Sequence, residues 1–115
     1  MQRQFRLTRS DDFKRVRRSG KSYAHPLVVL IAQPSESPRV RVGVAAGHTV
    51  GNAVHRNRAK RLLREAMRPL LPGLGPGWDL VVIARPPILG ASLEEARRAL
   101  TGLLGRAGII STYDA

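Results

Sequence analysis

The sequence predicts a single α+β domain, built as an α/β sandwich with its elements in the order α-β-β-β-α-β-α. The chain has 115 residues, which suits one domain, and 43% of them are hydrophobic, which is enough to form a core. Apolar runs of strand length also alternate with amphipathic helical patterns, as in layered folds that combine helices with a sheet. We therefore expect residues 1–115 to form one domain, with residues 106–115 as a tail.

A short, very basic helix is predicted to begin near Ser10. Gly20 is expected to end this helix as its C′ residue. Phe13 and Val16 lie three residues apart and share one face of this helix. The start of the helix carries candidate N-cap residues and acidic side chains that favour its positive end, namely Thr8, Ser10, Asp11 and Asp12. Most of the remaining helix surface is basic, with Lys14, Arg15, Arg17 and Arg18.

Three strands are expected to follow this helix. Residues 22–24 form a short one, Pro26 interrupts the pattern, and the apolar run at 27–32 has the length and β-branched content of a buried strand. A turn is predicted at 34–38. In residues 39–46, three valines alternate with Arg39, Arg41 and Gly43, and this period of two predicts a half-buried strand.

The second helix is predicted to be amphipathic with a basic face. At about 100° per residue, its apolar side chains fall in an arc of roughly 140°: Ala59, Leu62, Leu63, Ala66, Met67 and Leu70. The opposite arc is polar and basic, with Arg56, Asn57, Lys60, Arg61, Arg64 and Arg68. Val54 falls on the polar side and is expected at the helix entry, and Pro69 and Pro72 are expected to end the helix.

A connector at 71–77 leads to an apolar strand at 78–85. Ser92 and Glu95 then form the sequence of a capping box, which predicts the start of a third helix. Gly105 is expected to end that helix. Its core side chains are predicted to be Leu93, Ala96, Leu100, Leu103 and Leu104.

The charge of the chain points to a polyanionic partner. It carries 20 Lys and Arg against 8 Asp and Glu, a formal charge of +12, and the whole excess lies in residues 1–21 and 39–68. The second helix has six bases and one acid between Arg56 and Arg68, so these bases have few acids to pair with, and RNA or DNA contact is favoured. A membrane partner is disfavoured because both long helices have aliphatic faces suited to a core. The sequence contains no cysteine and no apparent signal peptide, which predicts a cytoplasmic protein.

No protein active site is visible in the sequence. The acids are mostly explained by helix starts, turns and solvated faces, and no pattern brings His25, His48 and His55 together as acid and base. No metal site is predicted either. The loop at 47–52 differs from the other glycine-containing segments, because it ends a strand and opens the basic helix, where free backbone N–H groups suit phosphate.

Residues 51–65, GNAVHRNRAKRLLRE, resemble the signature of the bacterial ribonuclease P protein component. Arg56, Asn57 and Arg58 match the Arg-Asn-Arg run at its core. The similarity extends to the first helix at 6–20 and to the strands before and after the signature. The flanks of the run are matched by Gly51, Asn52, Ala53, Lys60, Arg61 and Arg64.

The resemblance implies a mixed sheet with a left-handed βαβ crossover, where handedness rules alone predict a right-handed one. It also implies that the protein binds the catalytic RNA subunit of ribonuclease P, which carries the catalytic centre and its Mg²⁺, and helps it to remove the 5′ leader from precursor tRNA. The implied contacts with the RNA subunit are Gly51, Asn52, Arg56, Asn57, Arg58, Lys60, Arg61 and Arg64.

In the family, the first helix and one sheet face form a cleft for the single-stranded leader. This places Phe13, Arg17, Val29 and Ile31 at the leader. Arg17 and Ile31 stand where relatives often carry aromatic residues, and His48 and Thr49 stand where they often carry Lys or Arg. The alternative function is a small ribosomal or other structural RNA-binding protein, and a further one is a stand-alone nuclease or a DNA-binding domain. A helix-turn-helix is disfavoured because strands flank the basic helix.

Overall fold

The computed structural model describes residues 5–110 of the chain. The predicted order of elements is confirmed. The third strand starts at Arg41, two residues later than expected. The helices and strands are α1 (Ser10–Ser19), β1 (Lys21–Ala24), β2 (Val28–Pro34), β3 (Arg41–Ala46), α2 (Ala53–Met67), β4 (Trp78–Ala84) and α3 (Leu93–Arg106).

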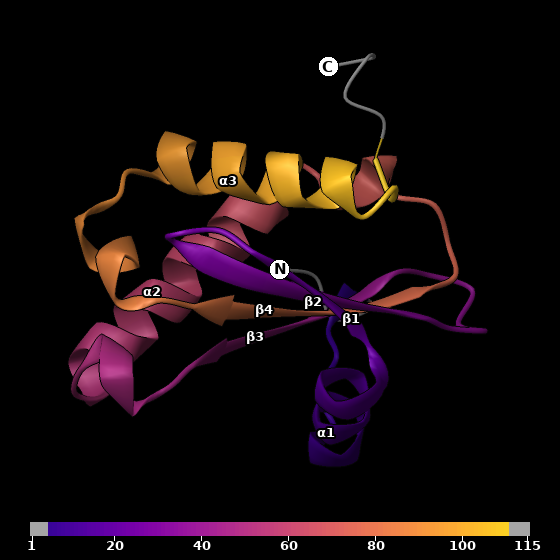
Figure 1. Ribbon diagram of the computed structural model, residues 1–115, viewed down its shortest axis with the longest axis horizontal. Coiled ribbons are helices and arrows are strands. Elements are labelled where there is room, and N and C mark those ends of the chain that lie inside the picture. The colour runs from indigo at the N-terminus through magenta and orange to yellow at the C-terminus, as the bar shows by residue number, and fades with distance from the viewer. Residues whose placement is uncertain (1–4, 111–115) are drawn as a thin grey trace.

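The four strands form one mixed sheet in the order β1-β2-β4-β3. β1 and β2 pair antiparallel, as do β2 and β4, whereas β3 and β4 are parallel neighbours joined along the chain through α2. The outer edge of β3 also receives a short parallel bridge from Arg6, and the Leu7 amide donates to the Val42 carbonyl at 2.9 Å. In Figure 1, α3 lies above the sheet and α1 below it. The helices therefore cover both faces of the sheet.

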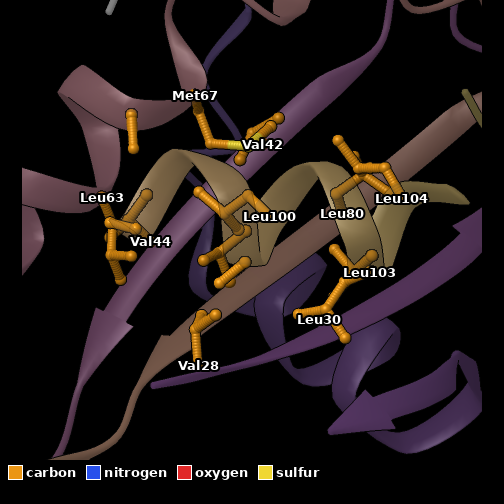
Figure 2. Close-up of a cluster of buried hydrophobic side chains, with 14 of the residues drawn as sticks. Val28, Leu30, Val42, Val44, Leu63, Met67, Leu80, Leu100, Leu103 and Leu104 are labelled. Carbon is orange, nitrogen blue, oxygen red and sulfur yellow. The ribbon is translucent and has the colours of Figure 1, made fainter. Parts of the chain in front are cut away.

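The main core lies between the sheet and the pair α2 and α3. Alternate residues of each strand, such as Leu30, Val42 and Leu80, point into it and are almost fully buried. Figure 2 shows these side chains in one cluster with Leu63 and Met67 of α2 and Leu103 of α3. The apolar arc predicted for α2 is confirmed, because its central members are buried.

A second, smaller core lies under α1 on the opposite sheet face. Val16 of α1 is fully buried there beside Ile31 and Val81. Two glycines let the helix lie close to the sheet: a Cβ at Gly20 would lie 2.7 Å from Ile31 Cγ2, and a Cβ at Gly43 would lie 2.3 Å from Phe13 Cζ. The prediction that β3 is half-buried is therefore wrong at Gly43, which is buried because Phe13 packs on it.

Helix ends follow the sequence signals unevenly. The capping box of Ser92 and Glu95 is confirmed at the start of α3. The N-cap of α1 is Arg9 rather than Thr8 or Ser10, without a side-chain capping bond, and Gly20 ends α1 with a φ of −78°, outside the left-handed region.

The end of α3 differs from its prediction. Gly105 lies inside the last turn, and the helix continues to Arg106. Gly108 takes a φ of +75°, and Ile109 and Ile110 fold back against the main core. The expected tail is therefore wrong for residues 106–110, and residues 111–115 lie outside the described residues.

Candidate nucleic-acid interface

The outer face of α2 is a continuous basic surface. Asn57, Arg58 and Arg61 are exposed, while Arg56, Lys60 and Arg64 are half-buried with their stems against the helix and sheet. Ala59 and Leu63 on the opposite side are buried in the core. The core thus fixes which side of α2 faces outward, and every cation of the Arg-Asn-Arg segment lies on that side.

The start of α2 is shaped by a loop with left-handed backbone. Gly51 has a φ of +135°, and a Cβ there would lie 2.7 Å from His55 Nδ1. Asn52 caps the helix, its side-chain oxygen accepting from the His55 amide at 3.0 Å. The next residues leave an apolar side chain outside, because Val54 is 70% exposed. Val54 therefore lies at the helix entry, as its place in the sequence predicts.

A small hollow of about 230 Å³ lies beside this helix start, between the end of β3 and the first two turns of α2. Arg56, Asn57 and Lys60 line it. The Nε of Arg56 is buried and has no acceptor among the described residues. A buried donor of this kind calls for a partner, and an RNA phosphate would supply one in a hollow lined by two cations.

One acid is fully buried and was missed by reasoning from the sequence. Asp79 of β4 has no exposed surface, and its carboxylate accepts from Arg41 at 2.9 and 2.8 Å and from Arg15 at 2.7 Å. The second terminal nitrogen of Arg15 donates to the side chain of Gln33. The available signal was an Asp inside the apolar run WDLVVIA, since a buried charge needs a partner.

The balance of forces on Asp79 favours its charged form. Burial raises the pKa of this carboxyl, but hydrogen bonds from Arg41 and Arg15, helped by their charges, outweigh it and hold the pKa below its usual value. Arg15 and Arg41 are thus committed to fixing α1 on the sheet. The cations that α1 presents to solvent are Lys14, Arg17 and Arg18.

Beyond α1, the same sheet face continues as a shallow apolar floor. Val29 of β2 and Ile83 of β4 are half-buried there, next to one another across the strand pair. Phe13 of α1 is half-buried against the same cluster, and Arg17, one turn along the helix, is exposed. The structure removes Ile31 from this open floor, because it is only 7% exposed and packs under Val16 of α1.

A pocket of about 200 Å³ lies between α1, the outer part of β3 and α2. Phe13 of α1 and Arg64 of α2 both line it, together with Arg6 and the buried Gly43 of β3. An aromatic edge and two guanidinium groups therefore meet at one place. The pocket thus brings Phe13 of α1 next to Arg64 on the basic face of α2.

Comparison with known protein families shows which family the chain belongs to. The model of the ribonuclease P family matches residues 1–108. The chain belongs to the ribonuclease P protein family. A ribonuclease P protein component from Herpetosiphon aurantiacus is 42% identical over 107 residues, covering 93% of this chain and 87% of the relative. Another from Dehalococcoides mccartyi is 44% identical over 106 residues, covering 92% and 87% of the two chains.

Solved structures of ribonuclease P proteins share the fold of this chain. The ribonuclease P protein of Staphylococcus aureus superposes with a TM-score of 0.81 at 28% identity, covering 93% of this chain and 98% of the other. That of Thermotoga maritima gives a TM-score of 0.77 at 28% identity, covering 88% and 96%. The α+β sandwich expected from the ribonuclease P resemblance is therefore confirmed. Family membership also favours a role in this endoribonuclease over that of a ribosomal protein.

Two further properties concern the described residues. Between residues 5 and 110, no three His, Asp or Glu side chains come together in a group that could hold a metal ion. In the same part of the chain, no helix has the length and apolar character needed to span a bilayer.

Proposed function

We propose that the chain is the protein subunit of ribonuclease P and helps a catalytic RNA to remove the 5′ leader from precursor tRNA. The observation that carries this proposal is the outer face of α2, which presents the Arg-Asn-Arg segment and its neighbouring cations on one side of a rigid helix. A helix held by core packing presents its cations to phosphates without further ordering, so less conformational entropy is lost on binding.

The RNA subunit is the proposed partner of this face. Gly51 and Asn52 shape the helix entry, and the side chains that contact RNA are Arg56, Asn57, Arg58, Lys60, Arg61 and Arg64. Guanidinium groups match phosphate oxygens in a two-pronged geometry, so this surface suits recognition of an RNA backbone and its shape.

The leader of precursor tRNA is the proposed occupant of the floor beside α1. Val29 and Ile83 offer apolar surface to unstacked bases, Phe13 offers an aromatic edge, and the guanidinium of Arg17 supplies charge and a stacking plane. The pocket lined by Phe13 and Arg64 supports continuity between the two sites, because one RNA assembly would cover both.

The chemistry of phosphodiester hydrolysis is proposed to lie in the RNA subunit, with Mg²⁺ held by RNA and substrate. Two acids of the described residues are engaged within the fold, since Asp79 is bonded to two arginines and Glu95 accepts from the Ser92 amide in the capping box of α3. The protein side chains would then bind and orient RNA, and no side chain of the chain is assigned as catalytic.

Reconstitution tests the proposed function. Precursor tRNA cleavage is measured with the RNA subunit alone, with the protein alone and with both, at low Mg²⁺. The expected result is efficient cleavage at the mature 5′ end only when both are present. A protein that neither binds the RNA subunit nor raises its activity would contradict the proposal.

A second experiment addresses the α2 face. Replacing Arg56, Arg58, Lys60 and Arg64 with Gln should abolish assembly with the RNA subunit and leave the circular-dichroism melting curve in place, because these side chains lie outside the core. Each lost phosphate contact should reduce the slope of log K against log salt by about 0.7 to 0.9. An unchanged salt slope would place the RNA site elsewhere.

A further inference from the structure

A second cation-lined groove runs along the outer side of α3, away from α1. A hollow of about 780 Å³ near Arg97 shares Arg98 and Gly102 with a second hollow of about 370 Å³. The second hollow in turn shares His25 with a third of about 530 Å³ at the tip of the β1–β2 hairpin. We call this continuous surface the α3 groove, lined by His25, Leu27, Arg97, Arg98, Gly102 and Arg106.

The charges of the α3 groove are held in place and only partly neutralised. Arg106 donates to the Ala24 carbonyl at 2.9 Å, and Arg85 at the hairpin end donates to the His25 carbonyl at 3.3 Å. These carbonyl acceptors fix the guanidinium groups without cancelling their charge. The Nε of Arg97 is buried and finds no acceptor among the described residues, so it also lacks a partner.

The acids beside the α3 groove are already engaged. The exposed side chains of Glu94 and Arg98 form an ion pair, with 2.8 Å between the carboxylate oxygen and the guanidinium nitrogen. The carboxylate of Glu95 accepts from the Ser92 amide at 3.0 Å in the capping box. Four arginines thus face two engaged carboxylates along this side of the molecule. A polyanion is the partner that such a lining fits.

Arg85, just beyond the end of β4, links the floor beside α1 to the α3 groove on the other face of the sheet. Along β4, alternate residues Val81 and Ile83 face the α1 side, and the extended backbone at Arg85 continues that alternation just beyond the end of the strand. Arg85 then reaches the hairpin carbonyl of His25, which lines the second hollow of the groove. Arg85 and Arg106 bond the carbonyls of neighbouring residues, His25 and Ala24, so both guanidinium groups lie at the hairpin tip.

We propose that the α3 groove binds the 5′ part of a long leader, upstream of the nucleotides held beside α1. This inference rests on the proposed leader binding. Among polyanions the leader is favoured, because it is already tethered at the adjoining floor and its effective concentration at the groove is high. An acidic segment of another protein would have no such tether.

A leader-length series tests the assignment in the reconstituted holoenzyme. Precursors are compared with leaders of about 4 and about 16 nucleotides, the span of single-strand site sizes for small RNA-binding folds. In Arg98→Gln/Arg106→Gln, affinity for the long-leader precursor should fall about tenfold. Affinity for the short-leader precursor should stay within about twofold, which controls for folding and for assembly with the RNA subunit. Equal affinity changes for both leaders would overturn the proposal.

Site-specific crosslinking supplies an independent measurement. The sequence contains no cysteine, and a Cβ at Gly102 meets no atom within 4 Å, so Gly102→Cys can carry a photocrosslinker in the groove. Gly73→Cys is the matched control, since its Cβ is equally free and it lies in the turn after α2. The expected crosslink joins position 102 to upstream nucleotides of the long leader, and position 73 gives none.

The outcomes separate the two proposals. If the wild-type holoenzyme binds leader-bearing and leaderless tRNA equally, leader binding itself fails. If it discriminates between them but position 102 crosslinks no leader nucleotide, or crosslinks an added acidic peptide instead, only the assignment of the α3 groove is overturned.

Discussion

The ion pairs of the buried Asp79 carboxylate should stabilise the fold, and removing them should change how the free energy of unfolding depends on pH. We consider Arg15→Met/Arg41→Met, which keeps the aliphatic stems and removes both cations bonded to Asp79. Asp79 has no exposed surface, so its charge would be left buried without a cation. Removing the partners of a buried charge costs about 3–5 kcal/mol at neutral pH. That is a large share of the about 5–15 kcal/mol that stabilises a typical domain.

The pH dependence should reverse between the two proteins. In the wild type the folded pKa of Asp79 is lowered, so its contribution is present above the unfolded pKa of about 3.9 and is lost as pH falls through the folded value. In the variant, burial alone raises the folded pKa. The protonated form then stabilises the fold below the unfolded pKa, and this contribution is lost as pH rises through the raised value.

Urea unfolding at about pH 3, 5 and 7 measures the difference, with the single tryptophan, Trp78, as the fluorescent probe. The free-energy gap between wild type and variant should be small at the lowest pH and largest at neutral pH. The charge-matched control is Arg68→Met/Arg98→Met, which removes two exposed ion pairs worth at most about 1 kcal/mol each. A gap that does not change with pH, or a control with the same gap, would refute the reasoning.

Three further predictions concern the RNA surfaces. Phe13→Ala should stay folded, because this half-buried ring contributes less than the about 3–5 kcal/mol of a buried Phe; holoenzyme binding should weaken by about 1–3 kcal/mol for leader-bearing precursor and not for mature tRNA. Gly43→Ala should lose about 1–3 kcal/mol in urea unfolding, because its Cβ would lie 2.3 Å from Phe13 Cζ. The double variant Gly43→Ala/Phe13→Ala should lose less unfolding free energy than the two single variants together, because the clash is gone. Strictly additive losses would contradict the contact between Phe13 and Gly43. Protein freed of RNA should not cleave precursor tRNA, and metal-dependent cleavage at the mature 5′ end would contradict this.

The local patterns of the sequence predicted much of the fold. The apolar arc of α2 and the capping box at Ser92 each reflect a periodicity or a hydrogen bond formed within a few residues, and the structure confirms both. The alternation in β3 correctly predicted that Val42 and Val44 are buried, but it failed at Gly43, which is buried too. The resemblance to the ribonuclease P family supplied the expected functional surfaces, because the Arg-Asn-Arg segment is itself a local signature.

The features that the sequence did not predict depend on which face α1 covers. Ile31 and Gly43 are buried because a short helix lies across their side of the sheet, and no pattern within β2 or β3 records that contact. The pairing of Asp79 with Arg15 and Arg41 joins three separate elements, so its members are far apart in the chain. Contacts of this kind depend on tertiary packing, and a single sequence gives no pairwise information about them.

The bridge between Arg6 and Val42 has a consequence for how copies of the protein behave when concentrated. A free strand edge is a template for pairing with another chain, and the segment at Arg6 and Leu7 occupies part of the outer edge of β3. The opposite edge belongs to β1, which has only four residues and opens with a lysine. A short edge that starts with a charge gives a neighbouring strand little to pair with. Both edge strands of the sheet therefore offer little free backbone for intermolecular β-pairing, which lowers the tendency of the RNA-free protein to aggregate.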